Sequence, residues 1–260
     1  MTIHDFNHAL VRVPSPSVVD GLRADDRGAP NYDGVAAEHA AYVRALEAAG
    51  VSVECLAALP DFPDAVFVED AALVFGDTAI LLRPGAPSRR GEAPALLPTL
   101  ERRFARVLRL EHGTAEGGDV LVTPSRVLIG QSARTNAEGA KALIALMADI
   151  GLNGVAVATP PDVLHFKSDC ALLDEETVLS TARLASSGAF AGVRVVLAPA
   201  GEEGAANAVR VNDRVLISEG YPRTAELLAT LGFRTVALEG REIAKIDAGL
   251  SCMSLRWRSP

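Results

Sequence analysis

A hairpin pattern that recurs along the chain constrains its fold more than any other feature. Two runs rich in Val, Leu and Ile flank a short group of turn-forming residues in each of the segments 70–84, 118–132, 168–183 and 207–220. Paired apolar runs around such a turn predict antiparallel β-hairpins. The hairpins begin about 40 to 50 residues apart, a period typical of propellers and other repeat architectures.

Helical patterns occupy most intervals between these hairpins. The segments 34–50, 136–151 and 222–232 carry apolar residues at helical spacing, and each ends at a glycine. Asn136 is a suitable N-cap, and Pro222 suits a first helical turn. A short apolar strand follows each of these helices. The repeating unit is therefore predicted to be a hairpin, a helix and a strand.

Each end of the chain carries a strand-like segment without a neighbour to form a hairpin. HALVRVP (8–14) precedes the first helix, and CMSLRW (252–257) follows the last one. Pairing the two would complete one further hairpin and close a ring. We therefore predict one α/β domain over residues 1–260, built as a closed ring of about five repeats. An open mixed α/β sheet is the alternative that spacing alone leaves.

Charge and composition exclude several classes of partner. The net charge is −8 and the sequence contains no basic run, so we expect neither nucleic acid nor an anionic membrane as a partner. The apolar runs are too short to cross a bilayer, and the first residues lack a secretory signal pattern. Three widely spaced cysteines argue against a disulfide framework, which predicts a reduced, cytoplasmic location.

The sequence also argues against a metal site. The three cysteines lie too far apart in the sequence for a Cys-x-x-Cys clip. His4 and His8 are four residues apart, but their segment is predicted to be a strand, where such positions are far from each other. We therefore expect no bound metal.

Side chains capable of chemistry stand just before or at the first strand of each hairpin. They are Glu69 and Asp70, Glu116 and Asp119, His165 and Ser168, Asn207, and Cys252. In a ring of equivalent units these positions converge on the axis, so carboxylates, an imidazole and a thiol would share one pocket. Each also has a structural explanation: surface charge or a turn for the acids, a core position for His165, and packing for a cysteine.

Two of the cysteines are candidates for a catalytic partner of His165. Cys170 lies five residues further on, in a stretch predicted to be extended, where an odd separation directs the two side chains to opposite faces. Cys252 meets no such obstacle. Cys170 and Cys55 have apolar neighbours and are expected to be packing residues.

Seven segments in order resemble the dimethylarginine dimethylaminohydrolases of the guanidino-modifying, or pentein, superfamily. They are PDAVFVED (63–70), RPGAPSRRGE (83–92), EGGD (116–119), GQSARTNAEGA (130–140), VLHFKS (163–168), GYPRT (220–224) and KIDAGLSCMSL (245–255). The resemblance runs nearly end to end and implies a five-bladed α/β propeller. Arginine deiminases of the same superfamily carry an extra helical insertion, for which 260 residues leave no room.

The resemblance also implies roles for individual residues. Cys252 would be the nucleophile and His165 the general acid and base. Asp70 would hold the substrate guanidinium together with Glu116, which also counts among the catalytic residues. The other implied substrate-binding residues are Arg89 and Arg134 at the amino-acid carboxylate, Leu22 in a loop over the site, and Asp64, Glu69 and Ile246.

The activity implied by the resemblance is hydrolysis of Nω-methylated L-arginine. Asymmetric dimethylarginine or monomethylarginine would yield L-citrulline and dimethylamine or methylamine through a covalent thiouronium adduct, without a metal or an organic cofactor. The expected partner is this small molecule, and the resemblance allows a homodimer. Two alternatives stay open: a related hydrolase acting on free arginine or another guanidine, and a catalytically silent binding protein of the same fold.

Overall fold

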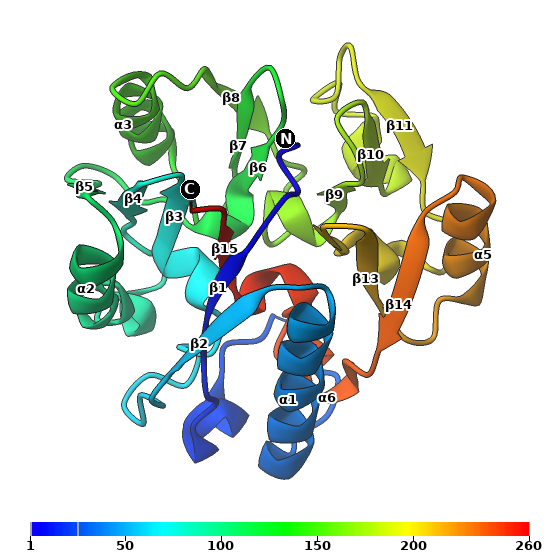
Figure 1. Cartoon of the computed structure of the whole chain (residues 1–260), viewed down its shortest axis with the longest axis horizontal. Helices are drawn as coiled ribbons and strands as arrows, with labels where there is room; N and C mark the ends of the chain where they lie inside the picture. Colours follow the sequence, from blue (N-terminus) through cyan, green and yellow to red (C-terminus); the bar gives the residue numbers. More distant parts are fainter. Residues whose placement is uncertain (1, 25, 260) are drawn as a thin grey trace.

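The computed structural model describes residues 2–24 and 26–259, and within them the strands form five three-stranded sheets around a common centre (Figure 1). In hydrogen-bonded order they are β15 (Leu255–Trp257), β1 (His8–Arg12) and β2 (Ser52–Leu56); β3 (Ala72–Phe75), β4 (Thr78–Leu81) and β5 (Arg106–Arg109); β6 (Val120–Val122), β7 (Val127–Gln131) and β8 (Gly154–Ala158); β9 (Cys170–Leu172), β10 (Thr177–Ser180) and β11 (Arg194–Leu197); β12 (Val209–Val211), β13 (Arg214–Ser218) and β14 (Arg234–Leu238). The predicted five-bladed α/β propeller is confirmed.

All five sheets share one internal pattern. The first two strands are antiparallel, and the third runs parallel to the second. In the β3–β4 hairpin, Phe75 pairs with Thr78 across the predicted turn at Gly76 and Asp77. A parallel third strand needs a crossover connection, and the helical segments supply it. The predicted unit of hairpin, helix and strand is therefore confirmed.

The ring closes by pairing the two ends of the chain. β1 lies between β15 and β2, with His8 opposite Trp257 in the antiparallel pair. Figure 1 shows the blue β1 beside the dark red β15 near the centre of the molecule. The rings of His8 and Trp257 stack with their centroids 5.5 Å apart. The predicted terminal hairpin is confirmed, and the open-sheet alternative is wrong.

The helices lie at the periphery, outside the sheets (Figure 1). They are α1 (Tyr32–Ala48), α2 (Glu92–Arg103), α3 (Ala137–Ala148), α4 (Ala182–Ala185), α5 (Pro222–Thr230) and α6 (Arg241–Ala244). The three predicted helices are α1, α3 and α5, and the Asn136 side chain caps α3 by accepting from the Gly139 amide. The helix α2 was not predicted, because Pro94 and Pro98 interrupt its helical pattern.

The hairpins start later than predicted, because short 3-10 turns occupy the residues just before their first strands. One precedes the first strand of every sheet: η2 (Val68–Ala71), η4 (Gly117–Asp119), η5 (Phe166–Ser168), η6 (Glu203–Ala206) and η7 (Leu250–Met253); η1 (Pro16–Asp20) and η3 (Pro87–Arg89) lie elsewhere. Cys252 thus lies in η7 and not in a strand, and residues 165–170 are not one extended stretch. Turns of three or four residues are too short to leave a periodic pattern in the sequence.

Apolar side chains attach each helix to its neighbouring sheet. In one cluster, Leu143 and Met147 of α3 pack with Ile129 of β7. Full burial of such a side chain contributes about 1.5–3 kcal/mol, so these contacts hold the blades in place. Among the helices of residues 2–24 and 26–259, none has both the length and the apolar character needed to cross a membrane.

Candidate active site

The 3-10 turns bring polar side chains from distant parts of the chain to the axis. Turn η2 packs against η4 and η7, and η4 packs against η5. Each turn closes with a backbone hydrogen bond to the carbonyl three residues earlier, as from Cys252 to Gly249 at 3.3 Å and from Ser168 to His165 at 2.9 Å. The turns therefore fix where the side chains next to each hairpin point.

A small cavity of about 30 Å³ lies where these turns meet. Most of the predicted site residues line it: Leu22, Asp64, Asp70, Arg89, Arg134, His165, Ile246 and Cys252. Its lining also includes residues that sequence reasoning did not identify: Phe67, Leu164, Asp247 and Ala248. These four had no signal in the sequence, because they are apolar or lie beside a predicted residue.

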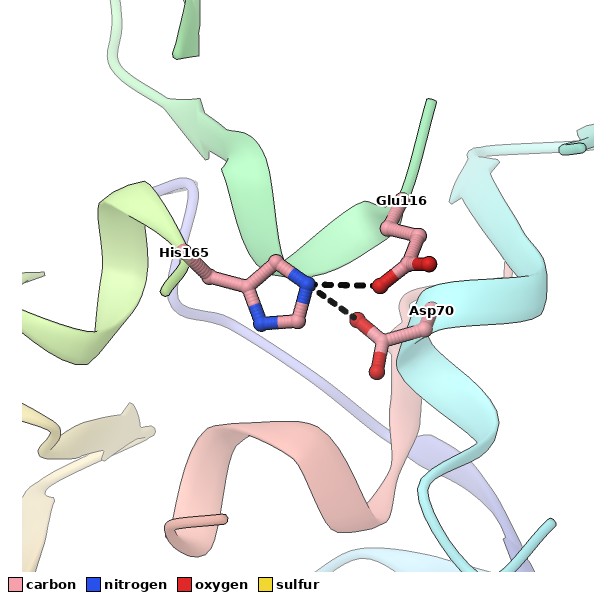
Figure 2. Close-up of side chains that lie close together, drawn as sticks. All are labelled: Asp70, Glu116 and His165. Atoms are coloured by element: carbon pink, nitrogen blue, oxygen red, sulfur yellow. Dashed lines mark hydrogen bonds and ion pairs between the residues drawn. The ribbon is translucent and has the colours of Figure 1, made fainter. Parts of the chain in front are cut away.

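His165 presents one ring nitrogen to two buried carboxylates (Figure 2). Its Nε2 lies 2.6 Å from Glu116 Oε2 and 4.0 Å from Asp70 Oδ1. Burial opposes a charge on the imidazole, but Asp70, the hydrogen bond to Glu116 and the charge of Asp119 outweigh it and raise the pKa of His165 to about 9. At neutral pH, His165 is therefore protonated and can donate a proton.

Glu116 lies behind His165 and is completely buried. Its Oε1 accepts a hydrogen bond from the Gly85 amide at 2.9 Å and lies 3.8 Å from Arg134 Nη1. Its other oxygen contacts His165. Glu116 thus orients the imidazole and faces the same arginine that is predicted to bind substrate.

Asp70, Glu116 and His165 also form a potential metal-binding group, since their ligand atoms lie within 4.8 Å of one another. The separation of 2.6 Å between His165 Nε2 and Glu116 Oε2 is a hydrogen-bond distance. A pKa near 9 keeps that nitrogen protonated at neutral pH, and a metal ligand needs a neutral imidazole. The geometry is that of a hydrogen-bonded cluster, and the expected lack of a metal stays a prediction.

Cys252 is buried, with 8% of its surface exposed at the cavity. Burial, followed by the charges of Asp70 and Glu69, raises the pKa of its thiol to about 12. A hydrogen bond from the Gly249 backbone and the charge of Lys167 partly offset these effects. The resting side chain is therefore a neutral thiol, and its ionisation needs additional positive charge.

Arg89 is buried and anchors one wall of the cavity. Its Nη1 lies 2.6 Å from Asp70 Oδ2, and its Nε and Nη2 bind both oxygens of Glu92 at 2.9 and 2.7 Å. Burial opposes ionisation of Asp70, but His165 and Arg89 outweigh it and lower the pKa of Asp70. Asp70 is therefore a carboxylate at neutral pH.

Asp64 connects the predicted covering loop to the cavity. Its Oδ1 accepts a hydrogen bond from the Leu22 amide at 3.0 Å. Further along the same loop, the Ala24 amide donates to Asp247. The loop is thus attached to the cavity wall at two points.

Glu69 and Asp70 are adjacent in sequence but line different cavities. Glu69 lines a second cavity of about 410 Å³ with mostly apolar walls, which lies beneath residues 2–6. Its Oε1 lies 2.6 Å from Lys167 Nζ and 3.0 Å from Arg256 Nη2. Its Oε2 is buried and has no hydrogen-bond partner among the described residues. The predicted contact of Glu69 with substrate stays a prediction.

Comparison with known proteins places the chain among arginine-modifying enzymes. The family model described as N,N dimethylarginine dimethylhydrolase, eukaryotic, matches residues 27–165. The N(G),N(G)-dimethylarginine dimethylaminohydrolase of Pseudomonas aeruginosa is 42% identical over 97% of this chain and 100% of its own length. The protein of the same name from Streptomyces coelicolor is 37% identical over 96% of each.

Solved structures agree with these matches. The Pseudomonas aeruginosa enzyme, as a cysteine-to-serine mutant complexed with citrulline, superposes with a TM-score of 0.94 at 40% identity, covering 97% of this chain and 100% of that one. The N-terminal domain of a cyanobacterial arginine dihydrolase has a TM-score of 0.87 at 20% identity, over 98% and 99% of the two chains, and shares the fold alone. This chain belongs to the dimethylarginine dimethylaminohydrolase family.

Proposed function

We propose that this protein hydrolyses Nω-methylated L-arginine to L-citrulline and dimethylamine or methylamine. The observation that carries the proposal is the meeting of Cys252, His165 and Asp70 in one cavity, although they are far apart in the sequence. The relatives with which the chain shares 42% and 37% identity bear the name of this activity.

Cys252 is the proposed nucleophile, and the substrate itself would promote its ionisation. A thiol with a pKa of about 12 is almost wholly protonated at neutral pH, and the thiolate is the attacking species. A guanidinium cation bound beside the sulfur would favour the thiolate by direct charge interaction. Protonated His165 would add to this effect. The thiol proton would leave to solvent as the substrate binds.

His165 is the proposed acid in the first step and base in the second. The Cys252 thiolate attacks the guanidino carbon, and the bond to the methylated nitrogen breaks as His165 gives that nitrogen a proton. A thiouronium adduct remains on the sulfur. Neutral His165 then takes a proton from water, and the resulting hydroxide attacks the adduct to form a tetrahedral intermediate. The thiolate departs from this intermediate, its hydroxyl proton passes to solvent, and citrulline remains. Each proton that His165 gives is thus recovered from water.

The carboxylates and arginines would bind the two ends of the substrate. Asp70 and Glu116 would pair with the guanidinium by charge-assisted hydrogen bonds. Arg134 retains 18% side-chain exposure and would bind the amino-acid carboxylate together with Arg89, which lines the same cavity. The remaining proposed contacts are Asp64, Glu69, and the backbones of Leu22 and Ile246. A cavity of about 30 Å³ implies that the loop at Leu22 opens to admit substrate.

Three further properties belong to this proposal. We propose that residues 1–260 form one catalytic domain, because the cavity collects residues from Leu22 to Cys252. A cytoplasmic location is supported by the small number of widely spaced cysteines. A homodimer is proposed as the assembly, and light scattering after gel filtration would test it.

A substrate panel tests the proposed function. Citrulline release should be fastest from asymmetric dimethylarginine or monomethylarginine and much slower from arginine. Acid quenching during turnover should trap the adduct on the Cys252 peptide for mass spectrometry. Faster release from arginine would instead support a hydrolase of unmethylated guanidines. Binding without turnover of any of the three would support a silent binding protein.

A further inference from the structure

One buried side chain joins the two turns that carry the proposed nucleophile and the proposed acid and base. Asn207 directly follows η6 and is 9% exposed. Its Nδ2 donates to the Lys167 carbonyl at 3.1 Å, and its Oδ1 accepts from the Ser251 amide at 3.1 Å. Lys167 lies two residues after His165, and Ser251 directly precedes Cys252. Asn207 therefore bridges η5 and η7 within two residues of each reacting group.

The chemistry of its two partners fixes the orientation of this amide. A backbone N–H can only donate and a backbone carbonyl can only accept, so Oδ1 must face Ser251 and Nδ2 must face Lys167. The reversed amide would place a donor against a donor and an acceptor against an acceptor. Both contacts are thus specific to an asparagine side chain in one orientation.

Gly249 confirms how closely this amide packs against the turn that carries Cys252. A Cβ built on Gly249 would lie 2.4 Å from Asn207 Cγ and 2.5 Å from Oδ1, distances that a real side chain does not reach. The carbonyl of Gly249 accepts the hydrogen bond from the Cys252 amide that closes η7. The amide of Asn207 therefore packs against the residue that precedes the turn and bonds to a residue inside it.

We propose that Asn207 is a positioning residue that fixes the Cys252 sulfur relative to the His165 imidazole. The proposal rests on the proposed function, because it assigns a task within that reaction. Asn207 does not itself touch the substrate cavity, whose described lining excludes it. A misplacement of 1 Å between reacting groups can lower a rate about 100-fold. The loss of Asn207 should thus lower kcat by up to about 100-fold while KM changes less than about threefold.

The variants Asn207→Ala and Asn207→Asp test this assignment. Both variants should lower kcat, and Asn207→Ala should lower it at every pH. The aspartate would place a carboxylate oxygen against the Lys167 carbonyl at neutral pH. At lower pH its protonated form can donate to that carbonyl, so the activity of Asn207→Asp relative to wild type should rise as the pH falls. A purely structural loss would leave that ratio independent of pH.

Asn212 offers a matched control in the same hairpin. Its side chain also bonds only to backbone, accepting from Phe6 at 2.8 Å and donating to Ala49 at 2.7 Å. Its φ of +53° suits glycine, so Asn212→Gly removes the side chain without backbone strain. This variant should lower the melting temperature and leave kcat unchanged. Equal losses of kcat in the Asn207 and Asn212 variants would overturn the proposal.

Alkylation of Cys252 separates this proposal from the proposed function, because it needs no turnover. Iodoacetamide labelling of the Cys252 peptide, followed by mass spectrometry, gives the pH at which the reaction is half-maximal. We expect that pH to rise in Asn207→Ala, because the thiolate loses the adjacent imidazolium. An unchanged labelling profile with kcat within twofold of wild type would overturn the proposal. If Asn207→Ala does not fold, the isosteric Asn207→Asp decides by the same two measurements.

Discussion

Two cavities lie along the ring axis, and the smaller one has the more polar lining. The cavity at Cys252 holds about 30 Å³ and has acidic, basic and imidazole side chains among its lining residues, whereas the cavity beneath residues 2–6 holds about 410 Å³ and is mainly apolar. Each contains a buried cysteine, Cys252 in one and Cys170 in the other. The comparison teaches that the volume of a cavity does not locate the chemistry; the convergence of ionisable groups does.

The difference arises from which elements line each cavity. First strands of the hairpins, such as β6 and β9, line the large cavity with apolar side chains. The 3-10 turns that precede these strands, and the residues next to them, supply Asp70, His165 and Cys252 to the small one. The lining of the large cavity also includes the ion pairs that Glu69 forms with Lys167 and Arg256.

The largest expected difference between the cavities concerns their cysteines. Cys252→Ser should lower citrulline release more than about 1,000-fold, because a hydroxyl is a much weaker nucleophile than a thiolate. Cys170→Ser should keep kcat within about twofold, since a serine can still donate to the Phe166 carbonyl that the Cys170 thiol contacts at 3.3 Å. Steady-state assays of both variants test this contrast, and similar losses in the two would remove the distinction.

The second prediction concerns the ion pairs of Glu69. Glu69→Gln leaves the partly buried Lys167 and Arg256 without a counter-charge, which should cost about 3 kcal/mol, or more than 100-fold in the unfolding equilibrium constant. Glu54 provides the control, because it also pairs with two arginines but at the surface. Glu54→Gln should cost less than about 1 kcal/mol. Urea unfolding measures both, and a large KM increase in Glu69→Gln would instead support its predicted substrate contact.

The third prediction concerns the charge on His165 in the small cavity. Glu116→Gln replaces the charged acceptor of the His165 hydrogen bond with a neutral amide and removes a charge that raises the pKa of His165, so this pKa should fall below about 9. We expect kcat to fall roughly 100-fold, within the range for loss of acid–base assistance. An NMR titration of the His165 ring measures the pKa directly. A value unchanged from wild type would show that Glu116 does not control this proton.

The same raised pKa has a consequence for stability in the wild-type protein. His165 binds its proton more tightly when folded than an unfolded histidine, whose pKa is about 6.5. Its contribution to stability is therefore complete below pH 6.5 and is lost as the pH rises through about 9. In Glu116→Gln, urea unfolding between these pH values should show a smaller decline.

The smallest expected effect concerns one arginine from each cavity. Arg134→Gln should raise KM for methylarginine about tenfold, equivalent to about 1.4 kcal/mol, by removing a partner of the substrate carboxylate. Arg210 lines the large cavity, and Arg210→Gln should leave KM unchanged. Initial rates over a range of substrate concentrations test the pair. A matching rise of KM in Arg134→Gln and Arg210→Gln would mean that the large cavity also influences substrate binding.

The strands were predictable from the sequence because their apolar runs are local signals. The hairpin across Gly76 and Asp77 and the pairing of the two chain ends follow directly from such runs. The helix α2 was missed because Pro94 and Pro98 break its pattern, although packing in the folded protein stabilises it. The position of Cys252 within a turn was missed because three or four residues leave no period to detect.

The sequence by itself determined the ring of hairpins and supplied the thiol, the imidazole and the acids, because pattern and residue type are properties of the chain. Only the tertiary structure decided that Glu69 lines the large cavity and Asp70 the small one. Glu69 and Asp70 are neighbours within η2, where successive side chains point about 120° apart because a 3-10 turn holds three residues. Their different cavities, and the bridge made by Asn207, depend on contacts between segments that are remote in the sequence.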